Sequence, residues 1–345
     1  MNSPTRPELL ADHTTLRLGG PVDRFVTART EEELVEAVSA ADAAGQPCLV
    51  LGGGSNLVVA DEGFRGTVVR IATSGVSADV GDDPSCGGAM VTVAAGESWD
   101  AFVATAVDRR WAGVEALAGI PGLMGATPIQ NVGAYGQEVS QTIASVRVWD
   151  RTLRGIRTFA NADCGFGYRH SRFKADPGRH VVLSVTFQLP QGDLGAPVTY
   201  AELARALGVE PGRRAPAADV REAVLGLRRA KGMVLDTGDH DTWSAGSFFT
   251  NPVVAAELVP EGAPTWPAEG GVKTSAAWLI EHSGFGKGYG DDGVGLSTKH
   301  TLALTNRGTG TTGDLLRLAR EIRDGVEAAY GIRLVNEPVL VGCSL

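Results

Sequence analysis

A segment with two hydroxyl groups is the part of this sequence best suited to chemistry. Ser244 and Ser247 belong to the string Ser-Ala-Gly-Ser-Phe-Phe-Thr-Asn-Pro, in which two phenylalanines follow Ser247 directly. Adjacent aromatic side chains can exclude water from a neighbouring hydroxyl, which can then protonate a strongly basic carbanion. Taken alone, the segment is better explained as a turn or a helix cap, so a catalytic role depends on companion motifs.

Two glycine-rich runs could supply a cofactor site. In residues 52–56, three glycines free the backbone, and its N–H groups can form a concave nest for a pyrophosphate. Leu57 stands where a dinucleotide fingerprint needs glycine, and no P-loop lysine follows. The second run, residues 118–136, is almost uncharged, so its amides could line a flat ring. A tight turn and a small-residue packing surface are the alternative interpretations of these runs.

Size, charge and cysteine usage limit the class of protein. The chain has 345 residues, 43% hydrophobic and 21% charged, as is typical of a soluble globular protein of two or three domains. Its net charge of -9 disfavours binding to nucleic-acid phosphates. The four cysteines form no Cys-x-x-Cys pair and lie beside no histidine cluster, so we expect reduced thiols and no metal site. Residues 1–12 lack the apolar core of a signal peptide and no apolar run reaches membrane-spanning length, so we expect a cytoplasmic protein.

Periodic apolar patterns predict the elements that position these motifs. Thr30 and Glu33 have the spacing of a capping box, Ser98 and Asp219 are predicted to cap two further helices, and Gly331 is predicted to end the last one. The predicted helices cover about 34–41, 99–107, 220–227, 276–280 and 314–330. A further short helix is expected within an inserted loop at 191–214, and a linker at 232–243 is expected to precede the last two helices. The predicted strands cover 47–51, 146–149, 181–187 and 332–341, with Pro338 at an edge or a bulge, and a further apolar run covers 57–59.

Together with Tyr168-Arg169 and Asn336-Glu337-Pro338, these motifs resemble a known family. The two glycine-rich runs are similar to the flavin-binding domain shared by vanillyl-alcohol oxidase and p-cresol methylhydroxylase. With the remaining motifs, the chain resembles the UDP-N-acetylenolpyruvoylglucosamine reductases, the MurB enzymes of peptidoglycan synthesis. The resemblance extends from the Thr-Thr-Leu-Arg-Leu-Gly-Gly-Pro string at 14–21 to residue 342, and the string at 245–252 is its most specific part.

The resemblance implies an α+β fold. A two-subdomain FAD-binding region of the p-cresol methylhydroxylase (PCMH) type would precede a C-terminal α/β substrate-binding domain. Residues 1–75, joined by the C-terminal strand at 332–345, would form the first FAD-binding subdomain. Residues 76–232 would form the second, and residues 240–331 would form the substrate-binding domain.

The resemblance also implies an oxidoreductase, a UDP-N-acetylmuramate dehydrogenase. FAD would bind noncovalently and be reduced by NADPH, and the enolpyruvyl group of the UDP-sugar would be reduced to give UDP-N-acetylmuramate. The reaction would serve peptidoglycan precursor synthesis, and with it cell wall biogenesis, cell shape and cell division. The enzyme would act as a monomer on a UDP-sugar, with no nucleic-acid partner and no membrane span.

Under this resemblance three residues carry the reaction. Hydride addition to the vinyl carbon of the substrate leaves negative charge that spreads into its carboxylate. Arg169 could hold that carboxylate through two hydrogen bonds, although its Tyr-Arg-His-Ser-Arg context would otherwise suggest a surface ion pair. Glu337, if protonated, could donate a hydrogen bond to the enolate, and would otherwise be a solvent-facing strand residue. Ser247, rather than Ser244, would donate the proton to carbon.

The binding residues follow from the matched motifs. The residues expected to contact FAD are Gly52, Gly53, Gly54, Ser55, Asn56, Gly119, Pro121, Gly122, Gly125, Ala126, Gln130, Asn131, Gly133, Ala134, Tyr135 and Gly136. The residues expected to contact the substrate are Tyr168, Tyr200, Lys231, Asn251 and Lys299. Among these, Tyr200 matches the substrate-closing tyrosine of one subgroup of the family.

Two other functions share part of this pattern. An alcohol or sugar oxidase of the same flavin superfamily would have the glycine-rich runs, but the string at 245–252 and the presence of both Arg169 and Glu337 argue against it. A flavin- or nucleotide-binding module without turnover would lack the catalytic set, and every expected member of that set is present in this sequence.

Overall fold

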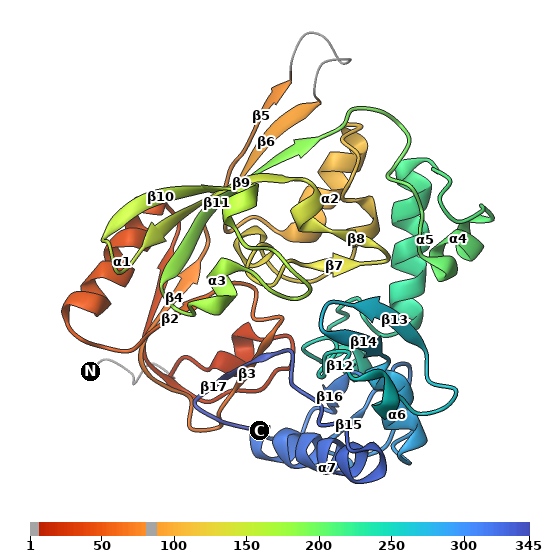
Figure 1. Ribbon diagram of the computed structural model, residues 1–345. Coiled ribbons are helices and arrows are strands. Elements are labelled where there is room, and N and C mark those ends of the chain that lie inside the picture. Colours follow the sequence, from red (N-terminus) through yellow and green to blue (C-terminus); the bar gives the residue numbers. More distant parts are fainter. Residues whose placement is uncertain (1–6, 81–87) are drawn as a thin grey trace. The chain divides into compact units, whose positions relative to one another are not determined.

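The chain folds into two compact units, each built from distant segments of the sequence (Figure 1). The computed structural model describes residues 7–80 and 88–345. We call residues up to 23, 54–65 and 230–345 the terminal unit, and residues 24–53 and 66–229 the central unit. The chain therefore leaves the terminal unit and returns to it twice.

A three-stranded sheet leads the chain into the first glycine-rich run. Its strands, in the order β1-β4-β2, are β1 (Val22–Ala28), β4 (Phe64–Ile71) and β2 (Cys48–Leu51). The helix α1 (Glu31–Ala43) packs on β2, and it begins with the predicted capping box between Thr30 and Glu33. β2 pairs in parallel with β4 and ends at the fully buried Leu51, so the glycine turn starts directly at a strand end.

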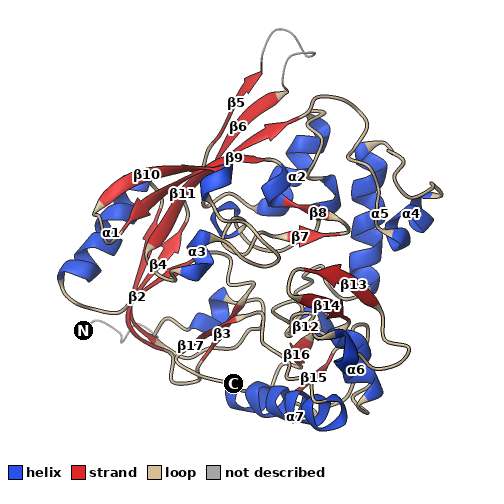
Figure 2. Ribbon diagram, viewed as in Figure 1, coloured by secondary structure: helices blue, strands red, loops and turns tan. Residues whose placement is uncertain are grey.

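A five-stranded antiparallel sheet forms the larger part of the central unit. Its order is β10-β9-β11-β6-β5, and Figure 2 shows these strands side by side. The strands are β5 (Val76–Val80), β6 (Ala89–Ala94), β9 (Ile143–Asp150), β10 (Gly155–Ala160) and β11 (His180–Leu189). The helix α2 (Trp99–Asp108), capped by Ser98 as predicted, packs Trp99 and Phe102 against Phe187 of β11. One face of the sheet is buried by this aromatic contact.

Shorter elements complete the central unit. They are η2 (Glu115–Leu117), β7 (Gly133–Ala134), β8 (Gln137–Glu138), α3 (Arg172–Ala175), α4 (Ala201–Leu207) and α5 (Ala217–Ala230). The helix α4 confirms the short helix expected within the insertion. The predicted cap of α5 is wrong, because the helix begins two residues before Asp219. The carbonyl of Asp193 accepts the Ala217 amide at 2.8 Å, so a distant backbone group satisfies the first turn instead of a local side chain.

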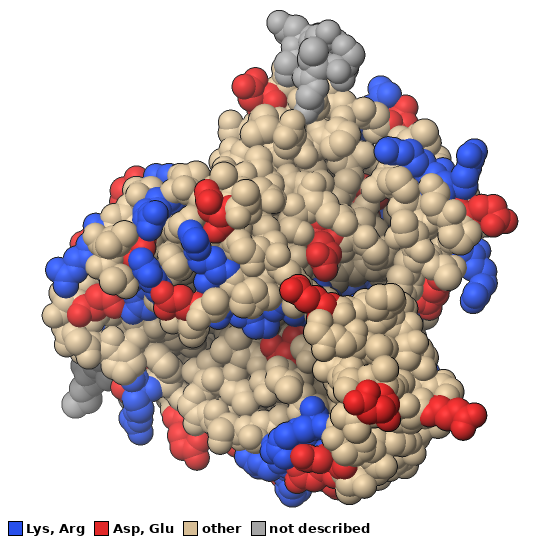
Figure 3. All heavy atoms as spheres, viewed as in Figure 1, with Lys and Arg blue, Asp and Glu red and all other residues tan. Residues whose placement is uncertain are grey.

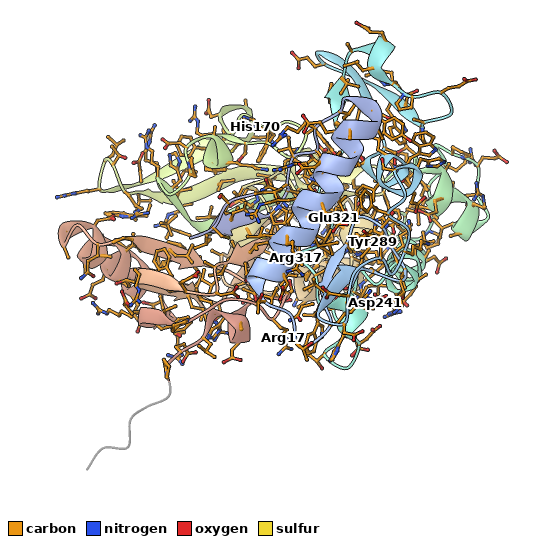
Figure 4. All side chains as sticks on the ribbon, turned by 90° about the horizontal axis from the view of Figure 1, so that it is seen from below. Arg17, His170, Asp241, Tyr289, Arg317 and Glu321 are labelled. Atoms are coloured by element: carbon orange, nitrogen blue, oxygen red, sulfur yellow. The ribbon has the colours of Figure 1, made fainter. Side chains whose placement is uncertain are left out.

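Helices and small sheets enclose the core of the terminal unit. The elements are β3 (Leu57–Val59), β12 (Val253–Val254), β13 (Thr265–Ala268), β14 (Gly271–Thr274), α6 (Ala276–His282), β15 (Val294–Leu296), β16 (Leu304–Asn306), α7 (Thr312–Tyr330) and β17 (Val339–Val341). The predicted stripe of α7 is buried in this core, and Gly331 ends the helix with φ of 68°. Tyr289 donates a hydrogen bond of 2.5 Å to Glu321 of α7 (both labelled in Figure 4), which fixes a loop to the helix.

The last strand is shorter than predicted. β17 covers only Val339–Val341, where it pairs in parallel with β3, whereas the sequence pattern predicts a strand from residue 332. Upstream of Pro338, Asn336 instead forms an isolated antiparallel bridge with Phe249. Pro338 has no N–H group to donate to a strand ladder, and it therefore stands where the chain changes partner.

The surface carries charges of both signs. On the face drawn in Figure 3, Lys and Arg side chains alternate with Asp and Glu side chains over the part of the surface that contains α1. Interspersed charges of this kind are typical of a solvated surface. Among the described helices, none combines the length and the apolar composition needed to cross a lipid bilayer.

A buried carboxylate lies at the end of β9 in the central unit. Asp150 has no exposed side-chain surface, and it accepts hydrogen bonds from the Arg179 guanidinium at 2.9 Å and from the amides of Thr152 and Leu153 at 3.0 Å. The hydrogen bonds from Arg179 lower the pKa of Asp150 from 3.8 to about 2, against the opposing effect of burial. The ionised carboxylate therefore stabilises the folded state.

Unfolding measurements at two pH values test this contribution. Because the pKa of Asp150 is lower in the folded chain, its stabilising effect is complete above about pH 4 and is lost as the pH falls through about 2. We expect Asp150→Asn to lower the free energy of unfolding at about pH 7 and to reduce its change between about pH 7 and about pH 3. The control is Asp176→Asn, which removes the more exposed carboxylate on Arg179, at 3.3 Å. Equal losses in the two variants in denaturant titrations would contradict the prediction.

Candidate active site

The segment 244–252 forms a turn over the core of the terminal unit. Gly246 has φ of 76°, a conformation that favours glycine. Phe248 and Phe249 are each 1% exposed, with ring centroids 5.1 Å apart, and the Phe248 amide donates to the Leu302 carbonyl at 2.7 Å. Ser247 itself is only partly buried. The fold therefore places an accessible hydroxyl next to a dry aromatic pair.

The two serines of this segment have different surroundings. The Ser244 hydroxyl accepts a hydrogen bond from the Gly246 amide at 3.2 Å, and its carbonyl accepts one from the Thr15 hydroxyl at 2.7 Å. Ser244 is buried and supports the turn. Within the described part of the chain, no hydrogen bond engages the Ser247 hydroxyl. Ser247 is thus the serine whose hydroxyl can meet a ligand.

Main-chain contacts bring Glu337 to the same segment. The Glu337 amide donates to the Phe248 carbonyl at 2.8 Å, next to the bridge between Asn336 and Phe249. Glu337 is only partly buried, like Ser247. Two of the three predicted catalytic residues, far apart in the sequence, are therefore neighbours within the terminal unit.

The end of the first glycine-rich run contacts the chain just after Glu337. The amide of Val339, just after Pro338, donates to the Asn56 carbonyl at 2.9 Å. Gly54 has φ of 61°, and a Cβ there would lie 1.9 Å from the His13 carbonyl oxygen, so no other residue fits. The run is thus held tightly at its end, and its last residue, Asn56, contacts the segment that carries Glu337.

The start of the same run has the form of an anion site. A Cβ at Gly53 would lie 2.8 Å from the Cα of Gly122, so the two glycine-rich runs touch through their backbones within the central unit. Around Gly52 the space for a Cβ is open, and the amides of Gly52 and Gly53 donate to no other described residue. Consecutive amide donors without protein acceptors fit the pyrophosphate of FAD.

The second glycine-rich run divides into packed and accessible residues. Gly119 and Gly125 support the fold, because the Gly119 amide donates to the Asp100 carboxylate at 2.6 Å and a Cβ at Gly125 would lie 2.7 Å from the Cβ of Ala95. The predicted FAD-binding residues of this run that retain exposed surface are Pro121, Gly122, Ala126, Gln130, Gly133, Ala134, Tyr135 and Gly136. This exposed set could line a flat cofactor.

A tight turn in the central unit presents Arg169. The amides and carbonyls of Gly167 and His170 pair across the turn at 3.1 Å, and Arg169 has φ of 51°, which is unusual for a residue other than glycine. Its Nη2 donates to the Gly133 carbonyl at 2.8 Å, and its Cζ lies 5.4 Å from the centroid of the Tyr168 ring. A guanidinium has five N–H groups, so the bond to the Gly133 carbonyl is compatible with binding a carboxylate.

Asn131 supports that turn with its side chain. It is 1% exposed, donates from Nδ2 to the Glu138 carboxylate at 2.8 Å and to the Gly167 carbonyl at 3.1 Å, and accepts the Ser140 amide at 3.1 Å. The residue expected to contact FAD is therefore a buried support for the turn that carries Arg169. Its contact with the cofactor stays a prediction.

Three tyrosines lie near these motifs in the central unit. Tyr168 and Tyr200 are each 44% exposed, and Tyr135 is partly exposed. The rings of Tyr135 and Tyr200 meet edge to face with centroids 5.5 Å apart. The structure thus joins an aromatic residue of the second glycine-rich run to the predicted substrate-closing tyrosine.

Three residues of the terminal unit are predicted to bind the substrate, namely two lysines and an asparagine. Two of them already make described hydrogen bonds or ion pairs within the protein. The Lys299 ammonium lies 2.6 Å from Asp239 and 3.9 Å from Asp241 (labelled in Figure 4), and the pKa of Lys299 is raised by its bond to Asp239. Asn251 accepts the Ala276 amide at 3.0 Å, so its carbonyl oxygen anchors α6. Lys231 is partly exposed. These contacts tie Lys299 into a carboxylate cluster.

Sequence reasoning missed the buried Glu115. It is fully buried and accepts hydrogen bonds from the Gly113 and Ala196 amides and from the Gln137 side chain. A signal was available, because Glu115 is the only charged residue between Trp111 and Gly136. A lone carboxylate in an apolar run indicates an internal hydrogen-bonding centre.

Comparison with known proteins matches both parts of this arrangement. Residues 22–154 match the model of an FAD binding domain, which agrees with the nest and the second glycine-rich run. Residues 238–341 match the model of the UDP-N-acetylenolpyruvoylglucosamine reductase C-terminal domain, which contains Ser247 and Glu337. The α+β architecture thus includes an FAD-binding domain.

Relatives and a solved structure extend the match to nearly the whole chain. The reductase of Cutibacterium acnes is 59% identical over 340 residues, covering 97% of this chain and 90% of the relative. The corresponding protein of Streptomyces avermitilis is 58% identical, covering 97% and 94%. The crystal structure of the MurB reductase from Thermus caldophilus superimposes with a TM-score of 0.66 at 25% identity, covering 97% of this chain and 98% of that one. The chain belongs to the UDP-N-acetylenolpyruvoylglucosamine reductase family.

Proposed function

We propose that this protein reduces the enolpyruvyl group of UDP-N-acetylglucosamine enolpyruvate to give UDP-N-acetylmuramate for peptidoglycan synthesis, using FAD and NADPH. A relative that carries the name of this reductase is 59% identical to the chain. The observation that carries the proposal is the hydrogen bond from the Glu337 amide to the Phe248 carbonyl. It brings a carboxyl group to the serine segment, as a reaction that stabilises and protonates an enolate requires.

Residues 52–56 would hold FAD, and the bound flavin would supply to the terminal vinyl carbon of the substrate a hydride that originates from NADPH. The electron pair of the vinyl group then resides on the neighbouring carbon and its carboxylate. Ser247 donates its hydroxyl proton to that carbon, a C–H bond forms, and the serine oxygen regains a proton from solvent. Phe248 and Phe249 are buried beside Ser247, and while the substrate covers the hydroxyl they would limit the access of water to it, which would make so weak an acid effective there.

Two further residues bind the developing negative charge. Arg169 donates hydrogen bonds to the substrate carboxylate, and the bond from its Nη2 to the Gly133 carbonyl holds the guanidinium in place. Glu337 in its protonated form donates a hydrogen bond to an enolate oxygen. A fixed cation and a fixed donor need no reorganisation as charge builds, which is the main source of transition-state stabilisation in such sites.

Accessible residues bind the sugar nucleotide and the cofactor. Tyr168, Tyr200, Lys231 and Asn251 contact the UDP-sugar, and the amides of residues 52–56 bind the FAD pyrophosphate. Lys299 is the weakest of the proposed contacts, because Asp239 and Asp241 already bind its ammonium group. A substrate phosphate would have to compete with both carboxylates.

The proposal includes a monomeric enzyme in the cytoplasm. The described cysteines Cys48, Cys164 and Cys343 are free thiols, which supports a reducing compartment. Burial raises the pKa of Cys164 to about 11, so that thiol is unreactive.

Two half-reactions test the proposed function. The purified holoprotein should be yellow, NADPH should bleach its flavin absorbance under nitrogen, and the enolpyruvyl sugar nucleotide should restore that absorbance with formation of UDP-N-acetylmuramate. Restoration by oxygen but not by the sugar nucleotide would reject the proposal. UDP-N-acetylglucosamine, which lacks the vinyl group, is the matched control and should restore nothing.

A further inference from the structure

Glu115 is a carboxylate without solvent contact that serves three donors. Its Oε2 accepts the Gly113 amide at 2.6 Å, and its Oε1 accepts both the Ala196 amide at 2.6 Å and the Gln137 Nε2 at 2.8 Å. The side chain belongs to η2 and is 0% exposed. Burying a charged group costs free energy unless several hydrogen-bond donors satisfy it. A fully buried carboxylate at residue 115 therefore points to a specific structural role.

Gln137 makes the connection rigid. Its Oε1 accepts the Ala116 amide at 2.8 Å while its Nε2 donates to Glu115, so both ends of the amide are engaged and its orientation is fixed. The chain of Ala196 approaches Glu115 so closely that a Cβ at Gly195 would lie 2.6 Å from Oε1. One oxygen atom of Glu115 therefore joins β8 to the loop at 195–196.

The two segments joined at Glu115 meet again at their other ends. Tyr135 lies two residues before Gln137 in the β7–β8 hairpin (Figure 1), and Tyr200 lies four residues after Ala196. Their rings are in edge-to-face contact at 5.5 Å. Next to this contact, Gly136 has φ of 85°, and a Cβ there would lie 2.5 Å from the Thr199 hydroxyl. The buried carboxylate and the exposed tyrosines thus fix the same two segments at opposite ends.

We propose that Glu115 and Gln137 form a buried clamp that positions Tyr135 and Tyr200, and that Glu115 thereby sets the affinity for the sugar nucleotide. The inference rests on the proposed function, in which Tyr200 contacts the UDP-sugar. Only a carboxylate offers two acceptor oxygens for three donors. An amide at residue 115 would present an N–H group to at least one N–H donor, and the clamp would loosen.

Binding to the oxidised holoenzyme tests the clamp without turnover. In calorimetric titrations with UDP-N-acetylglucosamine enolpyruvate, we expect Glu115→Gln and Gln137→Met each to weaken binding about tenfold, the effect of one lost hydrogen bond to a charged or buried group. The titrations compare samples matched in flavin content, because Tyr135, which the clamp positions, also belongs to the set expected to contact FAD. Hydrogen exchange should accelerate at residues 195–200 in both variants.

Combination with Tyr200→Ala separates positioning from general destabilisation. If Glu115 acts through Tyr200, adding Glu115→Gln to Tyr200→Ala should weaken binding no further. Asp150→Asn is the matched control, since it removes another fully buried carboxylate of the central unit that supports no tyrosine segment, and it should lower stability but leave binding unchanged. Additive losses in the double variant, or unchanged affinity in both folded clamp variants, would overturn the clamp. If Tyr200→Ala alone binds normally, the substrate role of Tyr200 is wrong and the inference fails at its base.

Discussion

Replacing Ser247 with alanine should separate the two halves of the catalytic cycle. We expect Ser247→Ala to reduce its flavin with NADPH at a rate within about twofold of the parent enzyme, while reoxidation by the enolpyruvyl substrate slows by about 10²- to 10⁴-fold, the usual contribution of a positioned acid. The reason is that the hydroxyl takes no part in reduction by NADPH, whereas hydride addition to the vinyl carbon reverses unless the neighbouring carbanion is protonated, so net reoxidation needs the proton of Ser247. Stopped-flow absorbance measures both steps on one sample.

Ser244→Ala provides the matched control for this prediction. Ser244 lies in the same segment, but its hydroxyl accepts the Gly246 amide and its side chain is buried. Its loss should lower the free energy of unfolding by about 1 kcal/mol, as for a single hydrogen bond, and leave both half-reactions nearly unchanged. If Ser244→Ala slows reoxidation as strongly as Ser247→Ala, the segment needs its shape and not its proton, and the role of Ser247 is wrong.

Local features of the fold could be predicted from the sequence because short-range interactions decide them. The capping box at Thr30 depends on residues three positions apart, and the stop at Gly331 depends on its own φ. The preference for Ser247 over Ser244 came instead from the family resemblance, and the catalytic role of Ser247 stays a prediction. Wherever adjacent residues contain all the information, the predicted element and the observed one agree within a few residues.

Features that depend on distant backbone groups could not be predicted. The start of α5 is set by the Asp193 carbonyl and not by Asp219. The length of β17 is set by the change of partner at Pro338, from Phe249 to Asn56. In both cases the sequence contains the correct polar groups, but only the tertiary structure determines which of them meet.

The candidate site shows the same distinction. The residue types that suit enolate chemistry were visible in the sequence, and the fold brings Glu337 to the serine segment through a main-chain hydrogen bond that no side-chain pattern announces. Lys299 was selected as a cation, yet a tertiary cluster of carboxylates binds it. Sequence motifs therefore identify candidate site residues. The structure shows which of these residues already form hydrogen bonds or ion pairs within the protein.

Replacing Arg169 with lysine should remove charge stabilisation while keeping the charge. Lysine has no planar fork, so it cannot hold the Gly133 carbonyl and a substrate carboxylate at once as a guanidinium can. We expect Arg169→Lys to lower kcat/KM for the enolpyruvyl substrate by about 10²- to 10³-fold, as when one preorganised donor of an oxyanion site is lost. Flavin reduction by NADPH should remain close to that of the parent enzyme. Steady-state kinetics in the sugar nucleotide measure the first effect, and anaerobic reduction measures the second.

Arg172→Lys is the matched control for Arg169→Lys. Arg172 lies on the neighbouring helix α3, and its guanidinium stacks over the ring of Phe159 at 4.6 Å. Its replacement should change the free energy of unfolding by less than about 1 kcal/mol and leave kcat/KM within about twofold. The comparison distinguishes a specific function of the turn at 167–170 from a general need for positive charge in this segment. If the two variants lose activity equally, Arg169 contributes only to the local potential, and the substrate carboxylate must be bound by another group.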